Sequence, residues 1–144
     1  MSQFATRVPM WFRIAALLLV IWGAGGVFSC VQQFRLGADA MGEATAYDRA
    51  LHAALPGWYN WVYALAVGSG FAGAVALLLG KAVARPLYLI SLIAVIAQFG
   101  YLFATTDIIA AKGVWVTYFP LAIVAITLIA VRLAGVARRS GWVR

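Results

Sequence analysis

The sequence predicts an all-α integral membrane protein, a four-helix bundle forming a single transmembrane domain over residues 1–144. Of the 144 residues, 65% are hydrophobic and only 10% are charged, which leaves too little polar surface for a water-soluble domain of this length. Four stretches are apolar over about 20 residues, the length that crosses a bilayer. Basic residues gather at alternate connections between these stretches, which is the pattern that sets orientation in a membrane.

The four spans are expected at residues 11–31, 58–80, 86–103 and 114–131. Each is expected to be helical, because a backbone in lipid must pair its own N–H and C=O groups. The first span carries three glycines near its middle, Gly23, Gly25 and Gly26. They indicate a bend or a close helix crossing, with a gap for a ligand as the alternative.

The second and third spans are joined by the short stretch LLLGKAVARPLYLI, residues 77–90. Gly80 is expected to weaken the end of one helix. Pro86 is tolerated at the first position of the next helix, where its missing N–H would be unpaired anyway. A connection this short makes the two helices antiparallel neighbours. Small residues recur along the second span, and three of them predict a close helix-packing surface: Gly68, Gly70 and Gly73.

Two segments are expected outside the bilayer. In the loop of residues 35–57, the stretch EATAYDRALHAALPG predicts a short helix that Pro56 and Gly57 end, lying on the membrane surface or capping the bundle. Residues 132–144 form a basic tail, with Trp142 as an interfacial anchor. Such a tail suits the anionic headgroups of membrane lipids.

Charge asymmetry predicts that both termini are cytoplasmic. One side of the membrane would carry eight basic and no acidic residues: Arg7, Arg13, Lys81, Arg85, Arg132, Arg138, Arg139 and Arg144. The other would carry three basic and four acidic residues: Arg35, Arg49, Lys112, Asp39, Glu43, Asp48 and Asp107. The expected orientation is therefore N-in and C-in, with the 35–57 loop in the periplasm.

The pattern points to no enzyme, cofactor or metal site. No acidic residue lies within a span, which argues against a small proton-coupled exporter. The chain has one histidine, His52, and one cysteine, Cys30, so neither a bis-histidine haem site nor a Cys-x-x-Cys motif fits within it. The basic residues lie between apolar stretches and not along one face, so no nucleic-acid partner is expected.

Six polar side chains lie towards the predicted periplasmic ends of the spans: Gln32, Gln33, Tyr63, Gln98, Tyr101 and Asp107. They predict either hydrogen bonds between helices or a shallow pocket open to the outer side. Gln98 is the most informative member, because an amide at that depth must find a partner. We expect it to point into the bundle near Gln32 or Tyr63.

Four segments of the chain resemble a family of small four-helix bacterial inner-membrane proteins. They are WFRIAALLLVIWGAGGV, YDRALHAALPGWYNWVYALAV, LLLGKAVARPLYLISLIAVIAQFGYLF and ARRSGWV, and they cover nearly the whole sequence. Some members of that family carry the label "sugar transporter", although the chain has none of the repeated, larger architecture of known sugar carriers. The resemblance implies a fold and a location, and it implies no catalytic residues.

The sequence is compatible with two functions. The first is a non-catalytic accessory or scaffold subunit of a larger membrane complex or homo-oligomer, which the small-residue surface and the missing ionisable groups favour. The alternative is a carrier or binder of a small neutral or lipid-like molecule that uses the outward-facing polar pocket. The expected partners are membrane lipids, with anionic headgroups at the basic side, and a protein partner or second copy.

Overall fold

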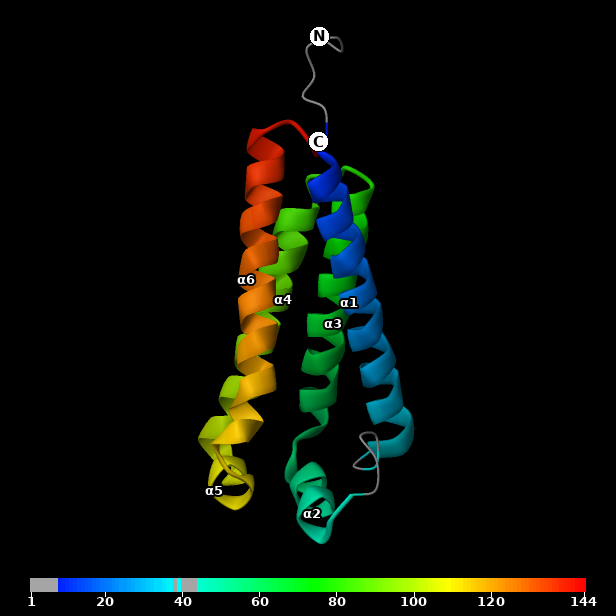
Figure 1. Ribbon diagram of the computed structural model, residues 1–144. Helices are drawn as coiled ribbons and strands as arrows, with labels where there is room; N and C mark the ends of the chain where they lie inside the picture. The colour runs from blue at the N-terminus through cyan, green and yellow to red at the C-terminus, as the bar shows by residue number, and fades with distance from the viewer. Residues whose placement is uncertain (1–7, 38, 40–43) are drawn as a thin grey trace.

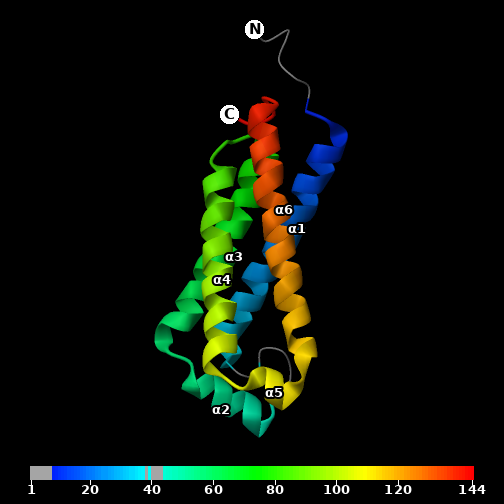
Figure 2. The ribbon, with the colours of Figure 1, turned by 90° about the vertical axis from the view of Figure 1, so that its left-hand side faces the viewer.

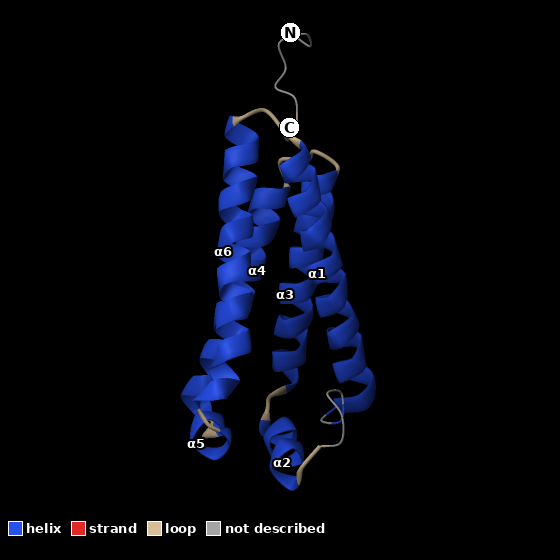
Figure 3. Ribbon diagram, in the orientation of Figure 1, coloured by secondary structure: helices blue, strands red, loops and turns tan. Residues whose placement is uncertain are grey.

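The computed structural model describes residues 8–37, 39 and 44–144, which form an all-helical bundle (Figure 1). Its four long helices are α1 (Met10–Leu36), α3 (Gly57–Leu78), α4 (Ala84–Thr105) and α6 (Tyr118–Arg139). Two short helices, α2 (Ala46–Ala54) and α5 (Ile108–Lys112), and the 3-10 turn η3 (Val114–Thr117) connect them. The long helices, with η3 extending α6, are long and apolar enough to cross a membrane. The predicted all-α, multi-pass membrane bundle is confirmed, and no strand occurs in the described ranges (Figure 3).

The long helices pack as a row of neighbours, α1 on α3, α3 on α4 and α4 on α6. The row curves so that α1 and α6 stand on one side of the bundle (Figures 1 and 2). The first turn of α1 and the C-terminus lie at one end, here called the terminal end. The helices α2 and α5 lie at the opposite end, here called the capped end. The cytoplasmic location of the terminal end stays a prediction. Two residues of the charge asymmetry behind it, Arg7 and Glu43, lie outside the described residues.

The hairpin between α3 and α4 forms as predicted, with boundaries shifted by two residues. Gly80 adopts a positive φ of 76°, and the Lys81 N–H donates to the carbonyl of Ala76 at 2.7 Å. This hydrogen bond is the usual capping bond at the end of a helix, and glycine supplies the left-handed conformation that it needs. Because α4 begins at Ala84, Pro86 is the third residue of the helix and not the first. Its missing N–H still costs nothing there, since the first four N–H groups of a helix have no partner within it.

Helix α3 buries one face of small residues and leaves another, with Gly68 and Ala72, exposed. Ala66, Ser69, Gly73, Ala74 and Ala76 are all buried. A Cβ at Gly73 would lie 2.9 Å from the ring of Tyr88 on α4, and a Cβ at Gly70 would lie 3.1 Å from the Ser91 hydroxyl. A Cβ at Gly68 would meet no atom of the described chain within 4 Å. Two of the three predicted packing glycines therefore lie against α4, and Gly68 does not.

The first long helix crosses α3 closely at its glycines. A Cβ at Gly23 would lie 3.0 Å from the Cα of Phe71, and one at Gly26 would lie 3.3 Å from Val67. Helix α1 stays α-helical through this region, so the close crossing expected for the glycines is observed without a break. A Cβ at Gly25 would meet no atom of the described chain within 4 Å. The helix also runs five residues beyond the predicted end at residue 31, to Leu36.

The segment after α6 folds back on the bundle. Helix α6 continues to Arg139, so residues 132–139, expected as part of a tail, are helical. The Arg144 N–H donates to the Gly80 carbonyl, and the Ala82 N–H donates to the Arg144 carbonyl, both at 2.9 Å. Trp142 packs on the rings of Trp11 and Phe12, with centroids 5.5 and 5.1 Å away. These contacts tie α1, the α3–α4 turn and the last residues together at the terminal end.

Candidate functional site: a cleft within the bundle

A cleft of about 850 Å³ lies inside the bundle, and all four long helices contribute to its wall. Most of the wall is apolar, with Trp22, Phe71, Phe99 and Phe119 among its aromatic members. A smaller set of polar side chains from the long helices is spread along it: Ser29, Gln33, Tyr59, Tyr63, Tyr88, Ser91, Gln98 and Thr127. Concave sites of a few hundred to about 1,000 Å³ with an apolar wall and a few polar groups are typical of small-molecule binding.

The helices α1 and α6 line the cleft from the two ends of the row. The rings of Trp22 and Phe119 lie 6.0 Å apart across the space between these helices. Close backbone packing joins α1 to α3 and α6 to α4, whereas α1 and α6 meet mainly through side chains. Nearer the terminal end, Phe12 of α1 shares an apolar cluster with Ala130 of α6. The side of the bundle between α1 and α6 is therefore closed mainly by side chains.

Tyr88 and Ser91 form the closed end of the cleft, here called the floor. Both are buried, each at 4% exposure, and they lie against Gly73 and Gly70 of α3. The Ser91 hydroxyl donates to the carbonyl of Ala66 at 2.7 Å. The Tyr88 hydroxyl is buried and has no hydrogen-bond partner within residues 8–37, 39 and 44–144. Below Tyr88, towards the terminal end, an apolar cluster that includes Phe12, Leu77 and Ala134 fills the bundle.

Three of the six predicted polar residues line the cleft. Gln98 is 6% exposed and lies against the hydroxyl of Tyr59 on α3. Tyr63 lies against Ser29 of α1. The Gln33 side-chain amide, which also lines the cleft, donates to Asn60 at 3.0 Å. Gln98 thus points into the bundle as expected, and it lies against Tyr59.

The other three predicted residues do not line the cleft. Gln32 accepts a hydrogen bond from Arg35 at 3.3 Å, on another face of α1. Successive residues on a helix point about 100° apart, and of these two neighbours only Gln33 lines the cleft. Tyr101 packs edge-on against Trp58, with centroids 4.8 Å apart. Asp107 is exposed and accepts a hydrogen bond from the Tyr47 hydroxyl at 2.7 Å.

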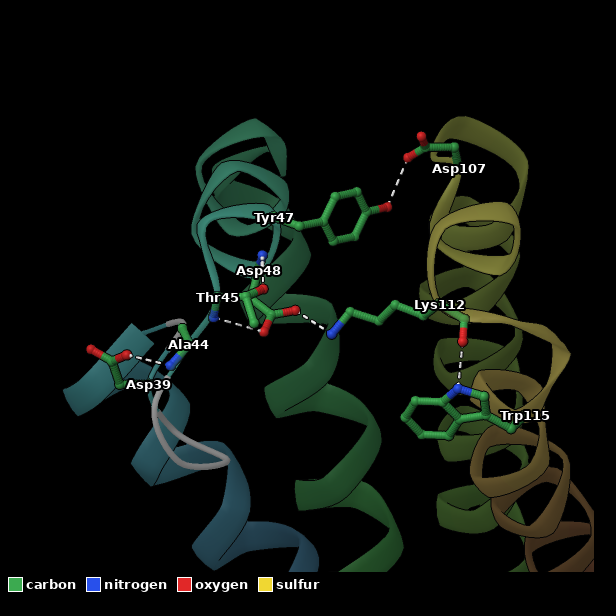
Figure 4. A network of polar contacts seen from close by, with 8 residues as sticks. All are labelled: Asp39, Ala44, Thr45, Tyr47, Asp48, Asp107, Lys112 and Trp115. Carbon is green, nitrogen blue, oxygen red and sulfur yellow. Dashed lines mark hydrogen bonds and ion pairs between the residues drawn. The ribbon is translucent and has the colours of Figure 1, made fainter.

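At the capped end, α2 and α5 are joined by two polar contacts, here called the clasp (Figure 4). Lys112 pairs with Asp48, and the Tyr47 hydroxyl donates to Asp107. Asp48 also completes the N-terminal cap of α2, where it exchanges hydrogen bonds of 3.1 Å with Thr45. Asp48 and Lys112 also line the cleft, so the clasp borders the cleft at the capped end.

The clasp residues have shifted acid–base properties. The hydrogen bond from Lys112 is the main cause that lowers the pKa of Asp48 to about 2, helped by the bonds from Thr45. The hydrogen bond to Asp107 is the main cause that raises the pKa of Tyr47 to about 12. Both contacts are therefore formed across the neutral pH range. In the described residues, Asp48 takes Lys112 as its partner and not His52, which lies beside Gly37.

Sequence reasoning missed the floor. Tyr88 and Ser91 are three residues apart and so share a face of α4, just as Gly70 and Gly73 share a face of α3. A matched pair of small and large residues on two antiparallel neighbours was the available signal. As for metals, no group of three His, Cys, Asp or Glu side chains comes together among the described residues.

Comparison with protein-family models, with curated proteins and with solved structures found no match to this chain. The family resemblance inferred from the sequence therefore stays a prediction.

Proposed function

We propose that this protein binds a lipid-like molecule within the bundle and acts as its carrier or binding protein in the membrane. The observation that carries the proposal is the cleft of about 850 Å³, whose wall is mostly apolar and whose side between α1 and α6 is closed mainly by side chains. A ligand dissolved in the bilayer would enter sideways past Trp22 and Phe119. It would exchange one apolar surrounding for another, so the few polar wall groups would supply orientation and specificity.

The scaffold function expected from the sequence rested on an unpaired small-residue surface of the second span. Residues of that surface, Ala66, Gly73 and Ala74 among them, are buried against helices of the same chain. Gly68 and Ala72 on another face of α3 stay exposed, so a smaller surface remains there for a partner protein. The wall of the cleft has no comparable internal partner, which favours ligand binding over scaffolding.

The proposal is tested with two glycine substitutions of the same kind. Gly25 lines the cleft and its Cβ would meet no atom of the described chain within 4 Å, so Gly25→Leu fills the cleft without forcing helices apart. Gly68→Leu is the matched control, because Gly68 has equally open surroundings and lies outside the cleft. Purification in mild detergent followed by mass spectrometry of the extracted lipids measures what each protein retains.

The wild type and Gly68→Leu are expected to retain a specific lipid-like molecule in near-stoichiometric amount, and Gly25→Leu to lose it. Thermal unfolding of the two variants checks that both remain folded. Retention by Gly25→Leu at the level of Gly68→Leu would rule out the cleft as the binding site. A stoichiometric protein partner with no retained small molecule would instead support the scaffold function.

A further inference from the structure

We infer that the floor of the cleft binds a neutral oxygen acceptor, a carbonyl or hydroxyl oxygen of the ligand, through the hydroxyl of Tyr88. The inference rests on the proposed function, because it concerns which lipid-like molecules the cleft selects. Its substrate class is a neutral lipid whose oxygen-bearing group enters the bundle first.

The hydroxyl of Tyr88 is buried without a hydrogen-bond partner among the described residues. Buried polar groups nearly always have a hydrogen-bond partner, and each exception needs a physical reason. Tyr88 is 4% exposed and its ring is fitted against Gly73. Phenylalanine would fill the same space without leaving a polar atom unpaired. Packing does not require this hydroxyl, whereas a hydrogen bond to a ligand atom would account for it.

The hydroxyl groups near the floor differ in whether they can still donate a hydrogen bond to a ligand. Ser91, one turn from Tyr88, has already donated its proton to the Ala66 carbonyl at 2.7 Å. Thr127, on the α6 wall, has donated its proton to the Ile123 carbonyl at 2.8 Å. Both oxygens can now only accept. Tyr88 therefore supplies the free donor of this part of the wall, and a donor selects an acceptor on the ligand.

The charged side chains that line the cleft lie far from the floor. The acidic and basic side chains that line the cleft are Asp48, His52 and Lys112, all on α2 or α5 at the capped end. Tyr88 lies ten residues before Gln98 along α4, which places the floor about 15 Å deeper than the Gln98 level. A charged group at the floor would find no counter-charge from this wall, and burying an unpaired charge is far more costly than burying a neutral oxygen. The floor therefore favours a neutral group.

The test uses two tritiated probes of equal chain length, 2-hexadecanone and hexadecane, with delipidated protein immobilised in detergent for a scintillation proximity assay. The wild type is expected to bind the ketone about 5- to 10-fold more tightly than the alkane, the size of one net hydrogen bond. Tyr88→Phe is expected to bind both probes equally. Tyr101→Phe is the matched control and should keep the ketone preference, because Tyr101 lies outside the cleft and packs on Trp58.

Thermal unfolding separates a binding role from a structural one. Ligand-free Tyr88→Phe should unfold at the wild-type temperature or above it, because the substitution removes an unpaired buried hydroxyl. A lower unfolding temperature, or a ketone preference that survives Tyr88→Phe, would overturn the inference. Equal binding of both probes by the wild type would overturn it too while leaving the proposed function intact. Failure of the wild type to bind either probe would reject both.

Discussion

Replacing Gly73 by alanine tests the α3–α4 interface with the smallest available change. The added Cβ would lie 2.9 Å from Cδ2 and 3.0 Å from Cε2 of Tyr88. These atoms belong to a buried ring, so the clash cannot be relieved by moving the end of a flexible side chain. Overpacking of this kind costs about 1–3 kcal/mol. Alanine also gains about 1 kcal/mol over glycine in helix propensity, which partly hides the cost.

Gly68→Ala removes that ambiguity, because it carries the same propensity gain on the same helix with no atom of the described chain within 4 Å of the new Cβ. The free energy of unfolding should differ between the two variants by about 1–3 kcal/mol, with Gly73→Ala the less stable. At this chain length the difference corresponds to roughly 4 °C per kcal/mol in unfolding temperature. Thermal unfolding in one detergent, followed by intrinsic fluorescence, measures it.

Equal unfolding temperatures for the two alanine variants would refute the reasoning. They would mean that the Tyr88 ring moves aside at no cost, or that α3 and α4 are farther apart in the membrane. Leu78→Ala supplies a further reference. Leu78 is 43% exposed on the outside of the bundle, so its truncation should lower the unfolding temperature less than Gly73→Leu does.

Three further predictions concern the clasp, the orientation and the cleft. Because Lys112 lowers the pKa of Asp48 to about 2, the ion pair stabilises α2 fully above about pH 4 and loses this effect as the pH falls towards 2. Hydrogen exchange of α2 should accelerate in that window, and Asp48→Asn should exchange fast throughout. A reporter active only in the periplasm should be silent when fused after Arg144 and active when fused near Gly42, which lies outside the described residues; the reverse pattern would contradict the charge asymmetry. Gln98→Leu should lower the free energy of unfolding by about 1–3 kcal/mol, because it removes the buried amide that lies against the Tyr59 hydroxyl. An unchanged unfolding temperature would show that the amide contributes no net stability.

The sequence predicted the features that depend on average composition. The four spans are found because lipid solvates any long apolar helix, whatever direction its individual side chains face. The α3–α4 hairpin and the short helix α2 follow from local signals: Gly80 and Pro86 for the hairpin, Thr45 and Pro56 for α2. Helix α5 was missed, because its five residues carry too short a pattern to be distinguished from a loop.

The residues of the cleft depend on helix rotation, which average composition does not encode. Gln32 and Gln33 are equally polar neighbours, yet only Gln33 faces the cleft. Asp107 was assigned to a pocket because it follows a span, but the clasp draws it towards Tyr47. A single sequence contains no measure of the rotation of one apolar helix against another, so half of the predicted cluster fell on other faces.

The floor joins two features that appear unrelated in the sequence. Small residues in a membrane helix are usually explained by close approach of a neighbouring backbone. At Gly70 and Gly73 the space is taken instead by the side chains of Ser91 and Tyr88, which brings two hydroxyl groups into the interior of an apolar bundle. The packing surface of α3 and the floor of the cleft are therefore formed by the same contacts between α3 and α4. A bulkier α3 would push the Tyr88 ring out of its place, and for this reason glycine is needed there by the site as well as by the fold.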